Sequence, residues 1–131
     1  KRDAMDNCFS LYRQYFGSPH FFFYDQKLIG QYYNMHEELM YFWVHDCNIQ
    51  MYQLNHEELV DEPKKVVSDV LKYCNLAWEE RCMKFYNNKR SVRTASSVQV
   101  REPINRKSIQ TWKKYENELA SMYKTLNYKN A

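Results

Sequence analysis

Glycine is almost absent from this chain: Gly17 and Gly30 are the only two among 131 residues, where average usage of roughly 7% would give about nine. Loops that cradle nucleotide phosphates follow patterns such as G-x-G-x-x-G or G-x-x-x-x-G-K-S/T, and neither can be written with these two positions. The G-x-S-x-G turn of serine hydrolases is excluded for the same reason. The sequence therefore contains no dinucleotide-binding loop, Walker-type loop or nucleophile elbow.

The pattern of apolar residues predicts a mainly α-helical chain, with about five helices and one or two short strands. With 44% apolar and 17% aromatic residues, the chain can form the core of one globular domain. Helical spacing, capping residues and Pro63 place the helices, and a short apolar run places the strand. The expected helices cover residues 6–16, 28–42, 63–74, 78–86 and 108–126, and the expected strand covers 49–54.

The second of these helices has an apolar stripe that we expect to be buried. The stripe consists of Leu28, Tyr32, Met35, Leu39 and Phe42. Residues 87–106 are polar, basic and without a lasting period, so they predict a long loop, and long loops inside compact domains are more often functional than accidental.

The cysteines and histidines do not form a metal-binding pattern. Cys8, Cys47, Cys74 and Cys82 contain no C-x-x-C pair, and we expect free thiols rather than zinc ligands. We therefore expect no metal cofactor and favour a reducing, cytoplasmic location. No stretch approaches the length of a membrane-spanning helix, and no signal peptide is recognisable.

Basic residues are concentrated in one segment. Between Lys84 and Lys114 there are nine Lys and Arg residues and one acidic residue, Glu102, although the whole chain has a net charge of only +3. Such a segment indicates an anionic partner: a phosphate or sulfate ligand, nucleic acid or an acidic protein surface.

Two sets of residues are candidates for binding such an anion. Arg2 and Ser10 flank the start of the first helix, where a guanidinium, unpaired backbone N–H groups and a hydroxyl could hold a phosphate. The segment 89–103 combines cations with serine and threonine, as a flap over an anionic ligand would. The alternatives are a solvated Arg2 with an ordinary surface serine, and a solvated charged loop.

These residues resemble a known family. Arg2, Asp6 and Ser10 are similar to the 3′-phosphate motif of sulfotransferases, with Ala4 where proline is usual. The segment 54–60 followed by Pro63 is similar to their Tyr-Glu-Asp-Leu segment, with His56 in place of tyrosine. Residues 75–79, 89–96, 99–104 and 108–115 follow in the order of the C-terminal half of the bacterial, tetratricopeptide-linked and tyrosylprotein branch.

The resemblance implies that the chain is the C-terminal part of one α/β sulfotransferase domain, covering residues 1–131. The family transfers a sulfuryl group from 3′-phosphoadenosine 5′-phosphosulfate (PAPS) to a hydroxyl-bearing acceptor, such as a glycan or a tyrosyl peptide. Arg2 and Ser10 would hold the 3′-phosphate, and the basic loop would cover the nucleotide. The expected loop contacts are Arg93, Ser96, Ser97 and Arg101.

The family's phosphosulfate loop and catalytic base precede the arginine–serine motif, so this piece alone should be inactive and carry no catalytic residue. Self-association through exposed apolar surface is a further expectation. The rival hypothesis is a basic helical module that binds an acidic protein or nucleic acid.

Overall fold

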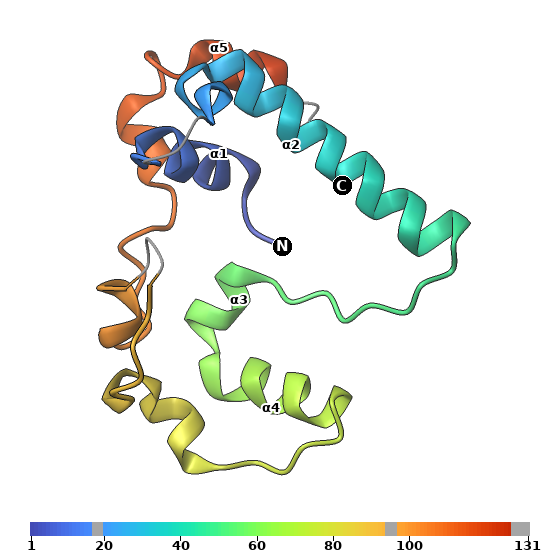
Figure 1. Ribbon diagram of the computed structural model, residues 1–131, viewed down its shortest axis with the longest axis vertical. Coiled ribbons are helices and arrows are strands. Elements are labelled where there is room, and N and C mark those ends of the chain that lie inside the picture. Colours follow the sequence, from blue (N-terminus) through green and yellow to red (C-terminus); the bar gives the residue numbers. More distant parts are fainter. Residues whose placement is uncertain (17–19, 94–96, 127–131) are drawn as a thin grey trace. The chain divides into compact units, whose positions relative to one another are not determined.

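The computed structural model describes residues 1–16, 20–93 and 97–126, and this part of the chain is helical with no strand (Figure 1). The α-helices are α1 (Ala4–Arg13), α2 (Gln26–Tyr41), α3 (His56–Asp61), α4 (Pro63–Tyr73) and α5 (Ala120–Thr125). Shorter 3₁₀ helices are η1 (Phe21–Tyr24), η3 (Glu80–Asn87), η4 (Gln99–Arg101) and η5 (Thr111–Tyr115), and η2 (Phe42–Asp46) is a π-helical turn. The prediction of a mainly α-helical chain is confirmed. None of the described helices is long and apolar enough to span a bilayer.

The chain divides into two compact units. One contains residues 2–51 and 108–131, and the other contains residue 1 and residues 52–107. In the first unit, Asp3 caps α1 and Asp25 caps α2, each by accepting a hydrogen bond from a backbone N–H in the first turn. Its apolar core is contributed by α1, α2, η5, α5 and adjoining residues. The core residues are Met5, Cys8, Phe9, Ile29, Trp112, Leu119, Met122 and Leu126.

The expected buried stripe of α2 is wrong. Its members are all exposed, with Met35 at 65% and Leu28 at 45%. The buried face of α2 instead carries Ile29 and Gly30, and it packs against α1 and α5. A stripe of apolar residues shows that a helix has an apolar face, but it does not show which face has a neighbour within this chain.

Gly30 is needed for close packing between α2 and α5. A methyl group added there would lie 2.9 Å from Cβ of Thr125, which is closer than side-chain carbons normally approach. This glycine therefore serves helix contact, not a phosphate loop.

The second unit contains α3, α4, η3 and η4. Asn55 caps α3 by accepting from the N–H groups of Glu57 and Glu58, and Pro63 opens α4 as predicted. The helix α3 was not predicted, because its apolar residues are too few to give a period. Among the described apolar residues of this unit, only Val66 is buried.

The strand predicted at 49–54 is wrong, since this segment is irregular. Lys1 lies beside the end of this segment: its terminal ammonium group donates to Leu54 O, and its carbonyl accepts from the N–H of His56, just beyond the segment, at 2.8 Å. A strand needs a run of such pairs with a neighbour, and no second extended segment pairs with it among the described residues.

The helix predicted from Ser108 onward is interrupted. Gln110 has a left-handed backbone (φ 55°) before the 3₁₀ turn η5, and regular α-helix begins only at Ala120. Within this segment Trp112, Leu119, Met122 and Leu126 are buried, whereas Tyr115 is 47% exposed.

Candidate functional site

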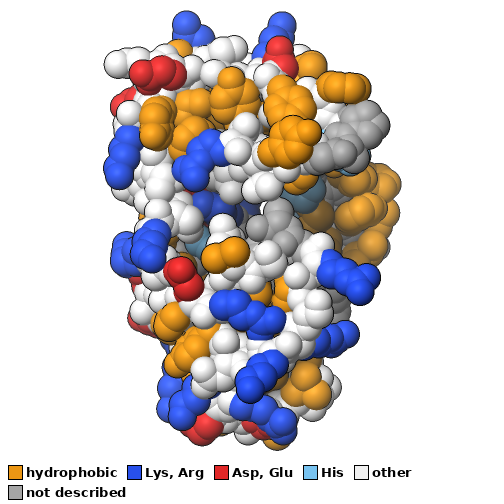
Figure 2. Space-filling model, turned by 60° about the vertical axis from the view of Figure 1, so that its left-hand side comes forward, with side chains coloured by type: hydrophobic (Ala, Val, Ile, Leu, Met, Phe, Trp, Pro, Cys, Tyr) orange, Lys and Arg blue, Asp and Glu red, His pale blue; other side chains and the backbone are white. Residues whose placement is uncertain are grey.

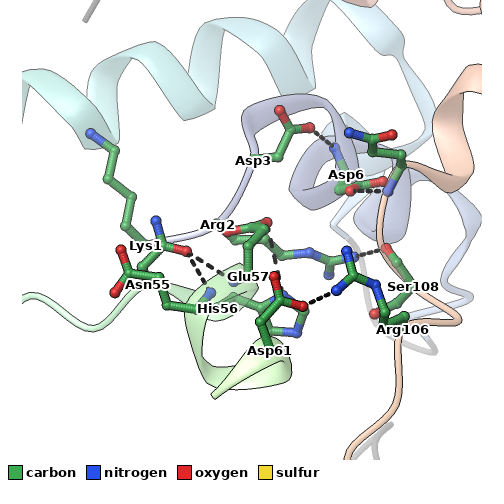
Figure 3. Close-up of polar contacts among 12 residues, drawn as sticks. Lys1, Arg2, Asp3, Asp6, Asn55, His56, Glu57, Asp61, Arg106 and Ser108 are labelled. Carbon is green, nitrogen blue, oxygen red and sulfur yellow. Dashed lines mark hydrogen bonds and ion pairs between the residues drawn. The ribbon is translucent and has the colours of Figure 1, made fainter. Parts of the chain in front are cut away.

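Arg2 lies immediately before α1 and is half-buried (Figure 3). Its Nη2 donates to the carbonyl of Ser108 at 2.7 Å. Its Nε is buried and has no hydrogen-bond partner in the described part of the chain. A buried donor without an acceptor lowers stability by about 1–3 kcal/mol, and the Nε of Arg2 is such a donor.

Asp6, the middle residue of the motif, is a structural group. Its side chain is 1% exposed and accepts from the backbone N–H of Gln110 at 2.5 Å and from Oγ1 of Thr111 at 3.5 Å (Figure 3). Arg2 and Asp6 thus both bind the segment 108–111. This link could not be predicted from the sequence, because the partners are more than one hundred residues away and two of the three contacts use backbone atoms.

Ser10 lies in α1, and its side chain is exposed. Its hydroxyl makes no hydrogen bond with any described residue, so it is free to bind a ligand. It is six residues beyond Ala4, or about 9 Å further along the helix axis. At the helix end where the cradle is expected, the Asp3 carboxylate already accepts from the backbone N–H of Asp6.

Burial also raises the pKa of a cysteine thiol on α1. The thiol of Cys8 has its pKa raised to about 12, first by burial and second by the nearby negative charge of Asp3. A thiol held protonated in this way is a core group and not a nucleophile.

The basic loop belongs to the other unit. Arg101, in η4, donates through Nη2 to the carbonyl of Arg90, so the two ends of the loop are joined. Arg93 and Ser97 are exposed, and their side chains have no partner among the described residues. Ser96, the remaining predicted contact, lies outside the described residues.

Two cations at the end of this loop are already paired. Arg106 forms an ion pair with Asp61, and Lys107 lies 3.4 Å from Glu102. Within the segment 89–103, the cations without a carboxylate partner among the described residues are Lys89, Arg90, Arg93 and Arg101. On the face drawn in Figure 2, Lys and Arg side chains outnumber those of Asp and Glu.

His56 is the first residue of α3. Its Nδ1 is buried without a hydrogen bond, and the nearest carboxylate, that of Glu57, is 3.9 Å away. No group of three or more His, Cys, Asp or Glu side chains that could hold a metal occurs within the described ranges.

Comparison with known proteins gives the family. Residues 1–80 match the model of the Sulfotransferase family. An uncharacterized protein of Aquifex aeolicus (strain VF5) is 36% identical to this chain over 129 residues. The aligned residues are 96% of this chain and 17% of that protein. No solved structure matches the chain. Since the family match covers more than half of the chain and includes both Arg2 and Ser10, the chain belongs to the sulfotransferase family.

Proposed function

We propose that this chain contributes the 3′-phosphate site of a PAPS-dependent sulfotransferase, with Arg2 and Ser10 as the phosphate ligands. The observation that carries the proposal is the buried Nε of Arg2, a donor that lacks an acceptor. A phosphate oxygen is the acceptor that a guanidinium binds best. The free hydroxyl of Ser10, on the helix that Arg2 precedes, supplies a second donor.

The basic loop supports the same proposal from the other unit. Arg93 and Arg101 keep their charges unneutralised by described carboxylates, and Ser97 adds a free hydroxyl. Such groups attract a polyanionic nucleotide and can stabilise charge on a departing phosphate. Ser96 completes the set of proposed contacts. The donor is PAPS and the acceptor a hydroxyl of a glycan or a tyrosyl peptide, in the tetratricopeptide-linked or tyrosylprotein branch.

The test compares adenosine 3′,5′-bisphosphate with adenosine 5′-monophosphate, which lacks the 3′-phosphate. We expect the chain to prefer the bisphosphate, with weak overall affinity measured by calorimetry or NMR titration. Charge-assisted hydrogen bonds contribute about 1.5–3 kcal/mol, so Arg2→Ala should reduce the preference by roughly ten- to a hundredfold. Ser10→Ala should reduce it less, and this substitution removes no side-chain hydrogen bond to any residue that the structure describes.

Arg13→Ala is the matched control, because Arg13 ends the same helix and its guanidinium lies over the ring of Phe9. It should leave the preference unchanged. A preference for the 3′-phosphate that survives both Arg2→Ala and Ser10→Ala would refute the assignment. Tighter binding of a short DNA duplex than of either nucleotide would favour the rival, a nucleic-acid-binding module.

A further inference from the structure

The unit of residues 52–107 contains an open groove that the proposed nucleotide site does not use. Its volume is about 580 Å³, within the range of roughly 300–1,000 Å³ that is usual for small-molecule sites. Helix α4 forms one side and the residues before η3 form the other. The lining residues are Lys64, Lys65, Ser68, Trp78 and Glu80.

The indole ring of Trp78 is held in place from both sides of the groove. Its Nε1 donates to Oε1 of Glu80 at 3.0 Å. The ammonium group of Lys64 lies 3.9 Å from the same oxygen and 5.7 Å from the centre of the ring. The ring is only half-buried, so it offers an oriented aromatic surface to a ligand in the groove.

Both ammonium groups of the groove are already paired with a carboxylate. Lys64 lies 3.9 Å from Glu80, which also lines the groove, and Lys65 lies 3.4 Å from Glu62, which does not. A phosphorylated or sulfated ligand would therefore meet two ammonium groups whose charges are partly neutralised and one carboxylate that repels it. This pairing argues against a nucleotide here.

The same groups suit a ligand rich in hydroxyls. A sugar hydroxyl can donate to a carboxylate and accept from an ammonium group, and the hydroxyl of Ser68, which has no partner within the described chain, can do both. A pyranose ring also has an apolar C–H face that packs on an aromatic ring. We propose that this groove binds a neutral oligosaccharide, with one sugar ring on Trp78 and its hydroxyls on Ser68, Lys65 and Glu80.

This inference does not rest on the proposed function, because it uses none of the residues assigned to the nucleotide and does not require the bound sugar to be the sulfate acceptor. It can be tested by titrating the full chain with chitotriose, cellotriose and maltotriose while the indole N–H signals are followed by NMR. Trp78→Phe identifies the Trp78 signal. We expect at least one of the three sugars to shift it saturably at millimolar concentration.

The variants separate a groove site from a surface effect. Trp78→Ala, which lacks the reporter indole and is therefore compared with the parent by calorimetry, should weaken binding about tenfold or more. Ser68→Ala should weaken it less without disturbing the fold. Lys72→Ala is the matched control, since Lys72 is exposed on the same helix outside the groove, and it should bind as the parent does. Arg2→Ala should also leave sugar binding intact, so failure of the two proposals can be told apart.

Three results would overturn the proposal. The first is the absence of a saturable shift with all three sugars, and the second is binding that Trp78→Ala and Ser68→Ala leave unchanged. The third is tighter binding of a heparin-derived tetrasaccharide or of ATP at the Trp78 signal, since either would mean that the groove selects anions.

Discussion

At the scale of single residues, the arginine–aspartate–serine motif combines structural and binding roles. Asp6 is buried and bonded to the segment 108–111, whereas Ser10 is exposed and free. Arg2 is in between, with one nitrogen bonded to Ser108 and another without an acceptor. The sequence could indicate that these residues belong together. It could not separate their roles, because these depend on partners from the far end of the chain.

The structural role of Asp6 gives a prediction about stability. Asp6→Ala should lower the free energy of unfolding by about 2 kcal/mol, because it leaves the N–H of Gln110 without an acceptor in a part-buried position. Asp6→Asn should lose less, since the amide oxygen can still accept. Urea denaturation followed by circular dichroism measures the difference. Asp69→Ala, at an exposed position of α4, should change stability little, and equal effects of Asp6→Ala and Asp69→Ala would show that Asp6 is not a structural link.

The raised pKa of Cys8 predicts how stability depends on pH. The native thiol keeps its proton up to about pH 12, whereas an ordinary thiol with pKa 9.0 releases it earlier. Above pH 9.0 the unfolded chain therefore binds fewer protons than the native one, and stability falls as pH rises. The pKa of Tyr33 is also raised, mainly by burial and then by Glu37, so it adds to the same trend at higher pH.

The measurement is urea denaturation at a series of pH values from neutral to alkaline. Cys8→Ala should be less stable than the parent at neutral pH because it leaves a small cavity, yet it should lose less stability above pH 9.0. Cys47→Ala, at an exposed position, should keep the full pH dependence. An alkaline slope that Cys8→Ala does not reduce would contradict the assigned cause.

At the scale of elements, the contact between α2 and α5 depends on the absence of a side chain at Gly30. Alanine usually stabilises a helix relative to glycine by about 0.5–1 kcal/mol. At this position the added methyl would meet Cβ of Thr125 at 2.9 Å, and overpacking costs about 1–3 kcal/mol. The steric effect should therefore win.

We expect Gly30→Ala to lower the free energy of unfolding by about 1 kcal/mol, as measured by urea denaturation. Gln31→Ala is the control, because Gln31 is exposed on the same helix and alanine should be neutral or slightly stabilising there. A Gly30→Ala variant that is more stable than its parent would mean that α2 and α5 can separate without loss.

Elements with strong local signals were predictable, and those set by partners were not. The proline that opens α4 acts within a few residues, so its effect can be read from the sequence. The side-chain caps were less predictable, because Asp3 caps α1 ahead of the expected helix start at residue 6 and no side chain caps α4. The segment 49–54 has the composition of a strand, but the backbone hydrogen bonds it makes with described residues go to Trp43 and Lys1 and not to a second strand. Likewise, the sequence shows that α2 has an apolar stripe, but it does not show that the stripe is exposed. Burial depends on which neighbour a helix face contacts in the folded chain.

At the scale of the whole molecule, the basic segment is divided between the units. The unit with residues 52–107 carries twelve basic and eight acidic residues, counting Lys1, and the other carries seven and eight. Lys113 and Lys114 thus belong to a different unit from Arg93 and Arg101. Counting charges along the sequence predicted an anionic partner, but it could not show this division or the neutralisation of Arg106 by Asp61.

The division into units also has a consequence for the order in which the chain can fold during synthesis. The unit of residues 2–51 and 108–131 is interrupted by the other unit, so its core needs residues from both ends. Met5, Cys8, Phe9 and Ile29 leave the ribosome long before Trp112, Leu119, Met122 and Leu126, which cover them in the finished protein. Until those last residues emerge, the first helices have an uncovered apolar face that chaperones can recognise and that can aggregate.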